Sequence, residues 1–315
     1  MKKFSLIVPF YYNEKNIKST LNELYSVLKQ ISNNFEVELI FIDDGSKDST
    51  WNLLNQEISD EFDHKLIKLS KNFGSHSAIL AGLSVSEGDA VGLITSDLQD
   101  PPELFLEMLK HWQEGFQAVL AVRKARSDGI FQILFSNLYY RLLNKFSNAN
   151  MPLGGFDFFV IDKKVAGLLV DMSEKNSSIT CQISWAGFNK KIIYYQREKR
   201  KIGKSSWTFN KKMKLFIDSF MAFSVFPLRL IQIAAGFFSF VGFIYLIIIL
   251  FLKINNKIPI HGIATVIGIL CISSGLILFS LSIIGEYIWR ILDQVRNRPI
   301  FIIEEYLKIK KSPYY

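Results

Sequence analysis

The sequence predicts an α/β domain, followed by an amphipathic helix and two membrane-spanning helices. Short β-rich runs alternate with helical stretches as far as residue 122, and two long uncharged runs follow residue 230. Hydrophobic residues make up 49% of the 315 residues and the mean hydropathy is +0.19, with the excess concentrated after residue 230. This length allows one full α/β domain of about 200 residues with a substantial core, and something smaller beside it.

The N-terminal domain, residues 1–207, is expected to contain an open sheet of Rossmann type. Strands are expected at residues 4–9, 36–43, 65–69, 90–94 and 118–122. Helices are expected at residues 14–30, 49–58, 75–86 and 102–114. Several strands are nearly continuous in apolar residues, which is typical of strands covered by helices on both faces. Ligands of such sheets bind beyond the carboxyl ends of the strands.

The segment ahead of the first uncharged run is basic and amphipathic. Residues 190–214 contain ten basic residues and one acid, within a chain of net charge +8. This position favours anionic lipid headgroups or a phosphate-bearing substrate as partners, and no nucleic-acid-binding signature accompanies it, so no nucleic-acid partner is expected. Residues 208–227 interleave lysines with large apolar side chains, which predicts a helix that lies along a membrane interface or packs on the N-terminal domain.

Two uncharged runs, residues 231–252 and 262–285, are expected to cross a membrane within the segment 228–289. They contain 22 and 24 residues, and a hydrocarbon core of roughly 30 Å needs about 20 helical residues. Both runs are apolar on every face, which disfavours a buried helical hairpin in a soluble protein. The outer flanks are more basic than the link between the runs, so the positive-inside rule places both termini in the cytoplasm, including a C-terminal tail at 290–315.

Polar residues follow two of the expected strands. Asp43 and Asp44 close the second strand, and such a carboxylate pair can bind a base and ribose or merely form a turn. Asp97 and Gln99 follow the fourth strand. Oxygen ligands of this kind suit Mg²⁺ or Mn²⁺, which neutralise the charge that builds on a leaving diphosphate.

Four motifs, in their order and spacing, resemble those of the family 2 glycosyltransferases, which have the GT-A fold. They are VPFYYNE at 8–14, DDGSKDST at 43–50, NFGSHSAILAG at 72–82 and SDLQDPPE at 96–103. The resemblance continues through residues 155–158, 185–188, 197–207 and 226–230 and both hydrophobic segments, so it covers nearly the whole chain. Within this family, the chain most resembles the polyprenyl-phosphate glycosyltransferase branch, which includes dolichyl-phosphate-mannose synthase and the bacterial bactoprenol glucosyltransferases.

The resemblance implies a donor site, a metal site and an acceptor site. The donor nucleotide is expected to contact residues in three of the motifs: Pro9, Tyr12, Glu14, Asp43, Asp44 and Ser96. Asp97 and Gln99 are expected to bind Mg²⁺ or Mn²⁺ and the diphosphate. Basic and hydroxyl side chains are expected to bind phosphate groups: Arg123, Arg126, Arg197, Arg200 and Ser205.

Asp157 is expected to act with Asp97 in catalysis, because it matches an element that family members place near the acceptor. An acceptor phosphate oxygen is already ionised at neutral pH. This carboxylate would therefore orient the acceptor or stabilise positive charge on the sugar, rather than act as a strong base. The alternative is an aspartate that caps a turn.

Two positions depart from the family pattern. An additional aromatic residue precedes Asn13, so either Tyr11 or Tyr12 meets the base. Thr95 stands where the family has the first acid of a D-x-D motif. Metal binding would then be weaker, or would rely on Gln99 and the diphosphate itself.

The expected activity is an inverting, metal-dependent transfer of one hexose, with UDP-glucose as the leading donor, to polyprenyl (undecaprenyl) phosphate. Alternatives are the same reaction with N-acetylglucosamine or another sugar, a polysaccharide synthase, and an inactive scaffold for a lipid-linked-sugar flippase. The expected partners are the nucleotide-sugar, the lipid phosphate, the bilayer, further copies of the chain as in a tetramer, a flippase and a downstream glycosyltransferase. The expected location is the cytoplasmic (inner) membrane of the cell envelope, as a multi-pass protein.

Overall fold

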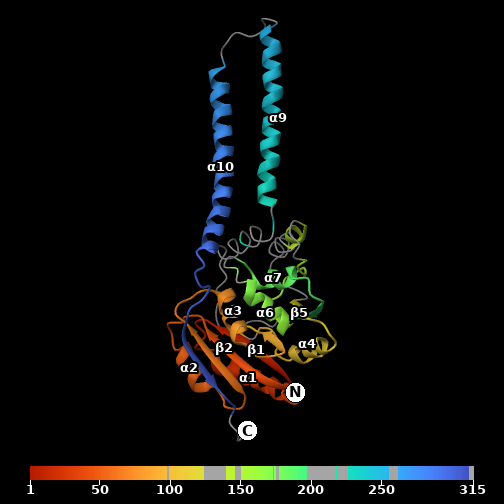
Figure 1. The fold of residues 1–315 in the computed structure, drawn as a ribbon, viewed down its shortest axis with the longest axis vertical. Helices are drawn as coiled ribbons and strands as arrows, with labels where there is room; N and C mark the ends of the chain where they lie inside the picture. Colours follow the sequence, from red (N-terminus) through yellow and green to blue (C-terminus); the bar gives the residue numbers. More distant parts are fainter. Residues whose placement is uncertain are drawn as a thin grey trace. The chain divides into compact units, whose positions relative to one another are not determined.

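The structure is a computed structural model that describes residues 1–97, 99–123, 140–145, 150–172, 174, 177–196, 218, 224, 226–254 and 262–311. The chain divides into two compact units. Met1–Ser219 and Pro299–Tyr315 form the first unit, and Phe220–Arg298 forms the second. A sheet and its covering helices make up the first unit, and two long helices make up the second (Figure 1).

Eight strands of the described chain form one sheet of mixed direction (Figure 1). They are β1 (Lys2–Phe10), β2 (Phe35–Asp43), β3 (Asp63–Leu69), β4 (Ala90–Leu93), β5 (Ala118–Arg123), β6 (Phe158–Asp162), β7 (Lys190–Tyr195) and β8 (Ile303–Ile309). Their order is β7-β5-β6-β4-β1-β2-β3-β8. The strands β4, β1, β2 and β3 are parallel neighbours and β5 is parallel to β7, whereas β6 and β8 run antiparallel to their neighbours.

Helices cover both faces of the sheet. They are α1 (Ile17–Ile31), α2 (Thr50–Glu57), α3 (Ser75–Val85), α4 (Leu104–Gln113), α6 (Lys163–Met172) and α7 (Ile179–Trp185). Apolar residues of α1, α2 and α4 share one core cluster with Phe4, Leu6 and Val8 of β1. Because successive strand residues point to opposite faces, Ile7 lies on the other face, where it meets α3 at Gly82.

The structure confirms the predicted α/β fold in its N-terminal part. The five predicted strands and four predicted helices are all present, and their ends differ from the prediction by at most three residues. The first helix begins at Ile17 because the preceding residues form a turn in which Asn16 N–H donates to Asn13 O at 2.9 Å. The strands β6, β7 and β8 were not predicted, and two of them make the sheet mixed.

The C-terminal segment 290–315 is not simply a tail beyond the catalytic domain, as the sequence analysis placed it. Helix α10 continues to Val295, and the residues from Ile303 to Ile309 form β8, paired antiparallel with β3 at the edge of the sheet. Backbone N–H groups fix both ends of this strand: Ser70 donates to Ile302 O at 3.0 Å and Lys311 donates to Asp63 Oδ1 at 2.8 Å. The β-branched and aromatic residues of this segment favour a strand.

The second unit contains α9 (Phe226–Ile254) and α10 (Ile263–Val295), which run side by side (Figure 1). Within them, Pro227–Tyr245 and Ile272–Val295 are long and apolar enough to cross a membrane, and neither segment is buried within the described structure. These helices agree with the two predicted membrane spans. The amphipathic helix predicted at 208–227 lies almost entirely outside the described residues.

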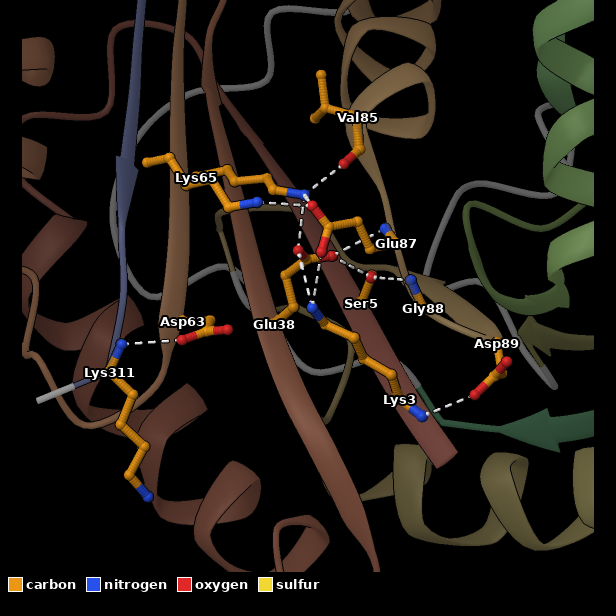
Figure 2. A network of polar contacts seen from close by, with 11 residues as sticks. Lys3, Ser5, Glu38, Asp63, Lys65, Val85, Glu87, Gly88, Asp89 and Lys311 are labelled. Atoms are coloured by element: carbon orange, nitrogen blue, oxygen red, sulfur yellow. Dashed lines mark hydrogen bonds and ion pairs between the residues drawn. The ribbon is translucent and has the colours of Figure 1, made fainter. Parts of the chain in front are cut away.

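A buried ion-pair network lies in the amino-terminal halves of β1, β2 and β3 (Figure 2). Lys65 and Glu38, which are 2% and 1% exposed, lie with Nζ and Oε1 2.7 Å apart. Lys65 Nζ also lies 2.7 Å from Glu87 Oε1 and donates to Val85 O at 2.6 Å. Glu38 accepts the backbone N–H of Glu87 at 3.0 Å, so both buried charges have several partners.

Three more side chains extend this network across the sheet, and Figure 2 labels two of them, Lys3 and Ser5. Ser5 Oγ donates to Glu38 Oε2 at 2.5 Å. Lys3 Nζ lies 3.0 Å from Glu87 Oε2, and Lys308 Nζ of β8 lies 2.8 Å from Glu87 Oε1. The network therefore links β1, β2, β3 and β8 to the loop between α3 and β4.

Candidate active site

The carboxyl ends of β1 to β5 all reach one edge of the sheet. In register, Phe10 of β1 lies beside Asp43 of β2, and Asp43 lies beside Lys68 of β3. The antiparallel strands β6 and β8 bring their amino ends, Phe158 and Ile303, to the same edge. Every predicted site residue that the structure describes lies in a strand end or loop at this edge.

A cleft of about 270 Å³ lies between the loops that follow β1, β2 and β3. Its lining includes the rings of Tyr11 and Tyr12, Ser46, three lysines and Glu304 of β8. The two tyrosine rings meet edge to face with centroids 4.6 Å apart, and the residues are 40% and 49% exposed. Exposed ring faces can stack on a planar group and the lysines can bind an anion, so the cleft suits a nucleotide.

The turn after β1 is strained at Tyr12. Its φ is 51°, a left-handed conformation that bulky residues rarely adopt. The loop after β2 fixes this turn, because Tyr12 N–H donates to Ser46 Oγ and Asn13 N–H donates to Thr50 Oγ1, both at 3.0 Å. Strained residues that their surroundings fix in this way cluster at ligand sites.

Asp43 and Asp44 lie behind the lining of the cleft and shape it. Asp43 Oδ1 accepts the Ser46 backbone N–H at 3.1 Å and the Ser46 hydroxyl at 2.5 Å. Asp44 accepts the backbone N–H groups of Phe73 and Gly74 at 2.8 and 2.9 Å. Burial raises the pKa of Asp43, and it raises the pKa of Asp44 to about 6, because desolvation outweighs these hydrogen bonds.

The loops that follow β2 and β3 touch at Gly45. Its φ is +66°, and a Cβ there would come within 2.3 Å of the Lys71 carbonyl carbon, so only glycine fits. Beside it, Asp43 Oδ2 is buried and has no hydrogen-bond partner among the described residues. A buried acceptor of this kind is satisfied when a ligand or water supplies a donor.

The other residues predicted to contact the donor nucleotide also lie at this edge, and two of them support its loops. Glu14 Oε2 accepts the Ser49 N–H at 3.2 Å, at the start of α2. Ser96 is 7% exposed, and its carbonyl oxygen accepts the hydroxyl of Thr20 in α1 at 2.8 Å. Pro9 is half-buried within β1.

The predicted metal loop follows β4. Thr95 Oγ1 donates to Asp97 Oδ1 at 2.8 Å, so a hydroxyl orients this carboxylate at the position where the family has another acid. Within the described ranges, no three His, Cys, Asp or Glu residues are grouped to hold a metal by themselves. The oxygens of Asp97 and Gln99 nevertheless fit Mg²⁺ or Mn²⁺, which bind one or two protein oxygens and take their other ligands from phosphates and water.

The predicted acceptor side lies where β5 ends and β6 begins. Arg123 Nη2 lies 2.6 Å from Asp157 Oδ2, and the two side chains are 14% and 59% exposed. Burial alone would lower the pKa of Arg123, but the carboxylates of Asp157 and Asp100 raise it above its usual value, so the guanidinium stays charged. Gly155 shapes the turn before Asp157, since its φ is +65° and a Cβ there would lie 2.0 Å from the Tyr140 hydroxyl.

Polar contacts connect the predicted metal loop to the predicted acceptor side. Asp100, which is fully buried, accepts the hydroxyl of Tyr195, and its Oδ2 lies 3.4 Å from Thr95 Oγ1. Tyr195 also lies beside Arg123 in the register of β5 and β7, and the two side chains interact. A series of polar contacts therefore leads from Asp97 to Asp157 through Thr95, Asp100, Tyr195 and Arg123.

Several residues at this edge were not predicted from the sequence, and four predicted residues lie outside the described part of the chain. Lys71 lines the cleft directly after β3, so the rule that ligands bind at carboxyl strand ends would have found it. Glu304 and Tyr195 come from strands that were not predicted. Four predicted phosphate-binding residues lie outside the described residues: Arg126, Arg197, Arg200 and Ser205.

Comparisons with known proteins point to one family. Residues 5–170 match the profile of glycosyl transferase family 2. An uncharacterized glycosyltransferase of Bacillus subtilis, YkcC, is 36% identical over 99% of this chain and 97% of its own length. The SfII prophage-derived bactoprenol glucosyl transferase of Shigella flexneri is 34% identical over 96% of this chain and 98% of its own.

A solved structure shows the same fold at lower identity. Mannosyl-3-phosphoglycerate synthase from Rubrobacter xylanophilus superimposes with a TM-score of 0.50 and 17% identity, over 74% of this chain and 75% of that one. This similarity concerns the fold alone, which is the predicted GT-A fold.

Proposed function

The chain belongs to glycosyl transferase family 2 and is a glycosyltransferase, and from this premise we propose that it transfers one hexose from a nucleotide-sugar to a polyprenyl phosphate. The donor is UDP-glucose, the acceptor is undecaprenyl phosphate, and the transfer inverts the anomeric configuration. The choice of glucose and of a bactoprenol-type lipid is supported by a relative named bactoprenol glucosyl transferase, which is 34% identical over nearly its whole length.

One observation supports this proposal most strongly. The cleft, Asp97 and the pair of Asp157 and Arg123 all lie at one edge of the sheet, and polar contacts connect Asp97 to that pair. A direct displacement requires donor and acceptor to meet in one place. A sheet that separated Asp97 from Asp157 would not allow it.

On the donor side, we assign the base to the tyrosine rings and the diphosphate to the metal loop. Tyr11 and Tyr12 offer faces for stacking, and Lys47 and Lys71 bring positive charge to the same cleft. Asp43 Oδ2, which has no hydrogen-bond partner among the described residues, fits an N–H group such as that of uracil. Asp44 acts indirectly, because it accepts the backbone N–H groups of Phe73 and Gly74 and so fixes the loop after β3.

A divalent cation completes the donor side of the proposal. When bound, Mg²⁺ or Mn²⁺ stabilises the negative charge of the leaving diphosphate. Asp97 and Gln99 are the residues that would bind it, and the Thr95 hydroxyl keeps Asp97 oriented toward that role. The need for a metal is part of the proposal and is tested with it.

On the acceptor side, an ionised phosphate oxygen of the lipid attacks the anomeric carbon in a single displacement. Arg123 binds the phosphate, because its guanidinium matches phosphate oxygens and remains charged. Asp157, more than half exposed beside Arg123, orients the acceptor or stabilises positive charge on the sugar. Arg126, Arg197, Arg200 and Ser205 are proposed to add phosphate contacts.

The two long helices suit a substrate that stays in a bilayer. We propose that α9 and α10 span the cytoplasmic membrane, with both termini and the catalytic unit in the cytoplasm. An anchored enzyme avoids much of the entropic cost of bringing itself to a membrane-bound acceptor. The product would pass to a flippase and a downstream glycosyltransferase, and the enzyme would work as a homo-oligomer.

One assay tests the proposal. Purified full-length protein is incubated with undecaprenyl phosphate, MnCl₂ and radiolabelled UDP-glucose or UDP-N-acetylglucosamine, and the products are extracted with organic solvent. We expect a labelled mono-glycosyl lipid with UDP-glucose, and none after EDTA treatment. A long water-soluble polymer would identify a polysaccharide synthase, and no product with any donor would identify an inactive scaffold.

A further inference from the structure

A single buried hydroxyl, that of Tyr195, lies between the donor and acceptor sides of the site. Tyr195 ends β7, and in register it lies beside Arg123 of β5. The residue is 6% exposed, and its ring packs edge to face on Phe158 with centroids 6.2 Å apart. Core packing requires only the ring, and phenylalanine would supply it equally well. The hydroxyl therefore needs a separate explanation.

This hydroxyl has two charged neighbours of opposite sign. It donates to Asp100 Oδ1, and it also interacts with the side chain of Arg123, its neighbour in the register of β5 and β7. Burial, followed by the charge of Asp100, raises the pKa of Tyr195 above its ordinary value, so the hydroxyl keeps its proton at neutral pH.

Asp100 contacts residues on the donor side of the site, and Arg123 contacts a residue on the acceptor side. Asp100 Oδ2 lies 3.4 Å from Thr95 Oγ1, and that threonine hydroxyl holds Asp97 Oδ1 at 2.8 Å. On the other side, Arg123 Nη2 lies 2.6 Å from Asp157 Oδ2. Tyr195 is therefore the link at which the two series of contacts join.

We propose that Tyr195 is a positioning residue that fixes the metal loop at 95–99 relative to the acceptor-binding Arg123. The inference rests on the proposed function, because it takes Asp97 as the donor-side group and Arg123 as the acceptor-side group. Loss of the hydroxyl removes one hydrogen bond from the buried Asp100 carboxylate and the polar contact with Arg123, so both sides would relax. A displacement of about 1 Å between reacting groups can lower a rate about a hundredfold.

The test is Tyr195→Phe in the full-length protein, with Tyr25→Phe as the matched control. Tyr25 is also a largely buried tyrosine, and its hydroxyl is hydrogen-bonded to Ser59 N–H at 3.1 Å and His64 Nε2 at 3.2 Å. It packs beside the start of β3, at the opposite end of the sheet from Asp97. Both variants lose a bonded hydroxyl, but only one loses it at the site.

Two measurements separate positioning from stability alone. The first needs no turnover: the rise in Tm that MnCl₂ plus UDP produces. The second is the steady-state rate with UDP-glucose and undecaprenyl phosphate, as kcat, as the MnCl₂ concentration at half-maximal rate, and as KM for the lipid. For Tyr195→Phe we expect kcat to fall by no more than about tenfold. The MnCl₂ concentration at half-maximal rate and the KM for the lipid should each increase at least about threefold, and the rise in Tm with MnCl₂ and UDP should be smaller than in the wild type.

The control variant should keep wild-type constants even where its own Tm falls. If Tyr195→Phe behaves like Tyr25→Phe, or if only the metal constant or only the lipid KM changes, the proposed link is wrong. Should Tyr195→Phe fail to fold, Asp100→Asn, which removes the charge but keeps an acceptor oxygen, must change both constants in the same directions. A wild-type protein that makes no glycosyl lipid would overturn the proposed function, and the rise in Tm with MnCl₂ and UDP would then decide the role of Tyr195.

Discussion

The two ends of the sheet use buried charge in opposite ways. At the amino end, Lys65 and Glu38 are almost completely buried, and their polar atoms have partners within the network of Figure 2. At the carboxyl end, Asp43 Oδ2 and Arg123 Nε lack partners in the part of the chain that the structure describes, and Tyr12 is strained. We expect the first arrangement to serve stability and the second to serve binding, because unsatisfied polar groups and strained residues are typical of functional sites.

The largest effect on folding should come from Lys65→Met. This change leaves the Glu38 carboxylate buried without its closest counter-charge, and breaking such a pair costs about 3–5 kcal/mol. The free energy of unfolding, measured with denaturant, should fall by that amount, while the kcat of the folded protein stays unchanged.

Lys308→Met is the matched control for this prediction. Lys308 belongs to the same network, but its side chain is 44% exposed, so its loss should cost less than about 1 kcal/mol. Equal losses for the two variants would contradict the contrast between buried and exposed members.

The next largest effect should appear in catalysis and not in folding. Asp97→Ala and Asp157→Asn should each lower kcat at least about a hundredfold, the scale of one lost transition-state interaction, or about 2.7 kcal/mol. Their Tm values should stay close to that of the wild type.

Asp162→Asn provides the control on the same strand as Asp157. Asp162 lies at the other end of β6, where its two carboxylate oxygens accept the Trp112 indole N–H at 3.1 Å and the Lys164 backbone N–H at 3.0 Å, whereas asparagine has one acceptor oxygen. This variant should keep its kcat and lose stability. Near-normal rates in Asp97→Ala or Asp157→Asn would instead remove that residue from the site.

A smaller effect should separate the two adjacent tyrosines of the cleft. Stacking of a base on an aromatic ring is worth about 1–3 kcal/mol, so Tyr12→Ala should raise the Kd for UDP, measured by calorimetry, about tenfold. Tyr11→Ala should raise it less, and Tyr194→Ala, an exposed tyrosine of β7, should leave it unchanged. A larger increase in the Kd for Tyr11→Ala than for Tyr12→Ala would assign the base to the ring of Tyr11.

The smallest effect concerns pH. Hydrogen bonds from Lys308, Lys65 and Lys3 hold the pKa of Glu87 well below its usual value of 4.5. Its contribution to stability is therefore complete above pH 4.5 and is lost as the pH falls toward the folded-state pKa. Between pH 5 and 3, the Tm of Glu87→Gln should fall less than the Tm of the wild type, and parallel curves would contradict the network's role.

The pKa shifts of Asp43 and Asp44, at the carboxyl end of the sheet, have the opposite sign to that of Glu87, so these residues affect the pH dependence of stability in the opposite direction. Burial raises the pKa of Asp44 from 3.8 to about 6, so its contribution lowers stability as the pH rises through that interval. The two ends of one sheet are thus expected to respond to acid in opposite directions.

The sequence predicted those parts of the fold that depend on local pattern. The strands β1 to β5 are apolar and have clear flanking turns, and the helices between them were recognisable for the same reason. The strand β8 was missed because it is separated from its partner β3 by more than 200 residues, including both long helices. No local signal reports a pairing over that distance.

The candidate site was predictable where chemistry follows residue type. Asp97, Asp157 and Arg123 were named in advance, and the structure places all three at the same edge of the sheet. The supporting contacts of Glu14 and Asp44 depend on which backbone N–H groups lie nearby. Tyr195 resembles any aromatic residue of a strand, so its link to Asp100 and Arg123 is visible only in three dimensions.

The return of the chain as β8 constrains how the protein is made. The edge of β3 stays open until the ribosome has synthesised residues 303–309, so α9 and α10 emerge before the sheet is complete. An unpaired strand edge is a template for aggregation. A version shortened to end before α9 would keep that edge exposed, whereas a flexible linker in place of residues 220–298 would let β8 close it.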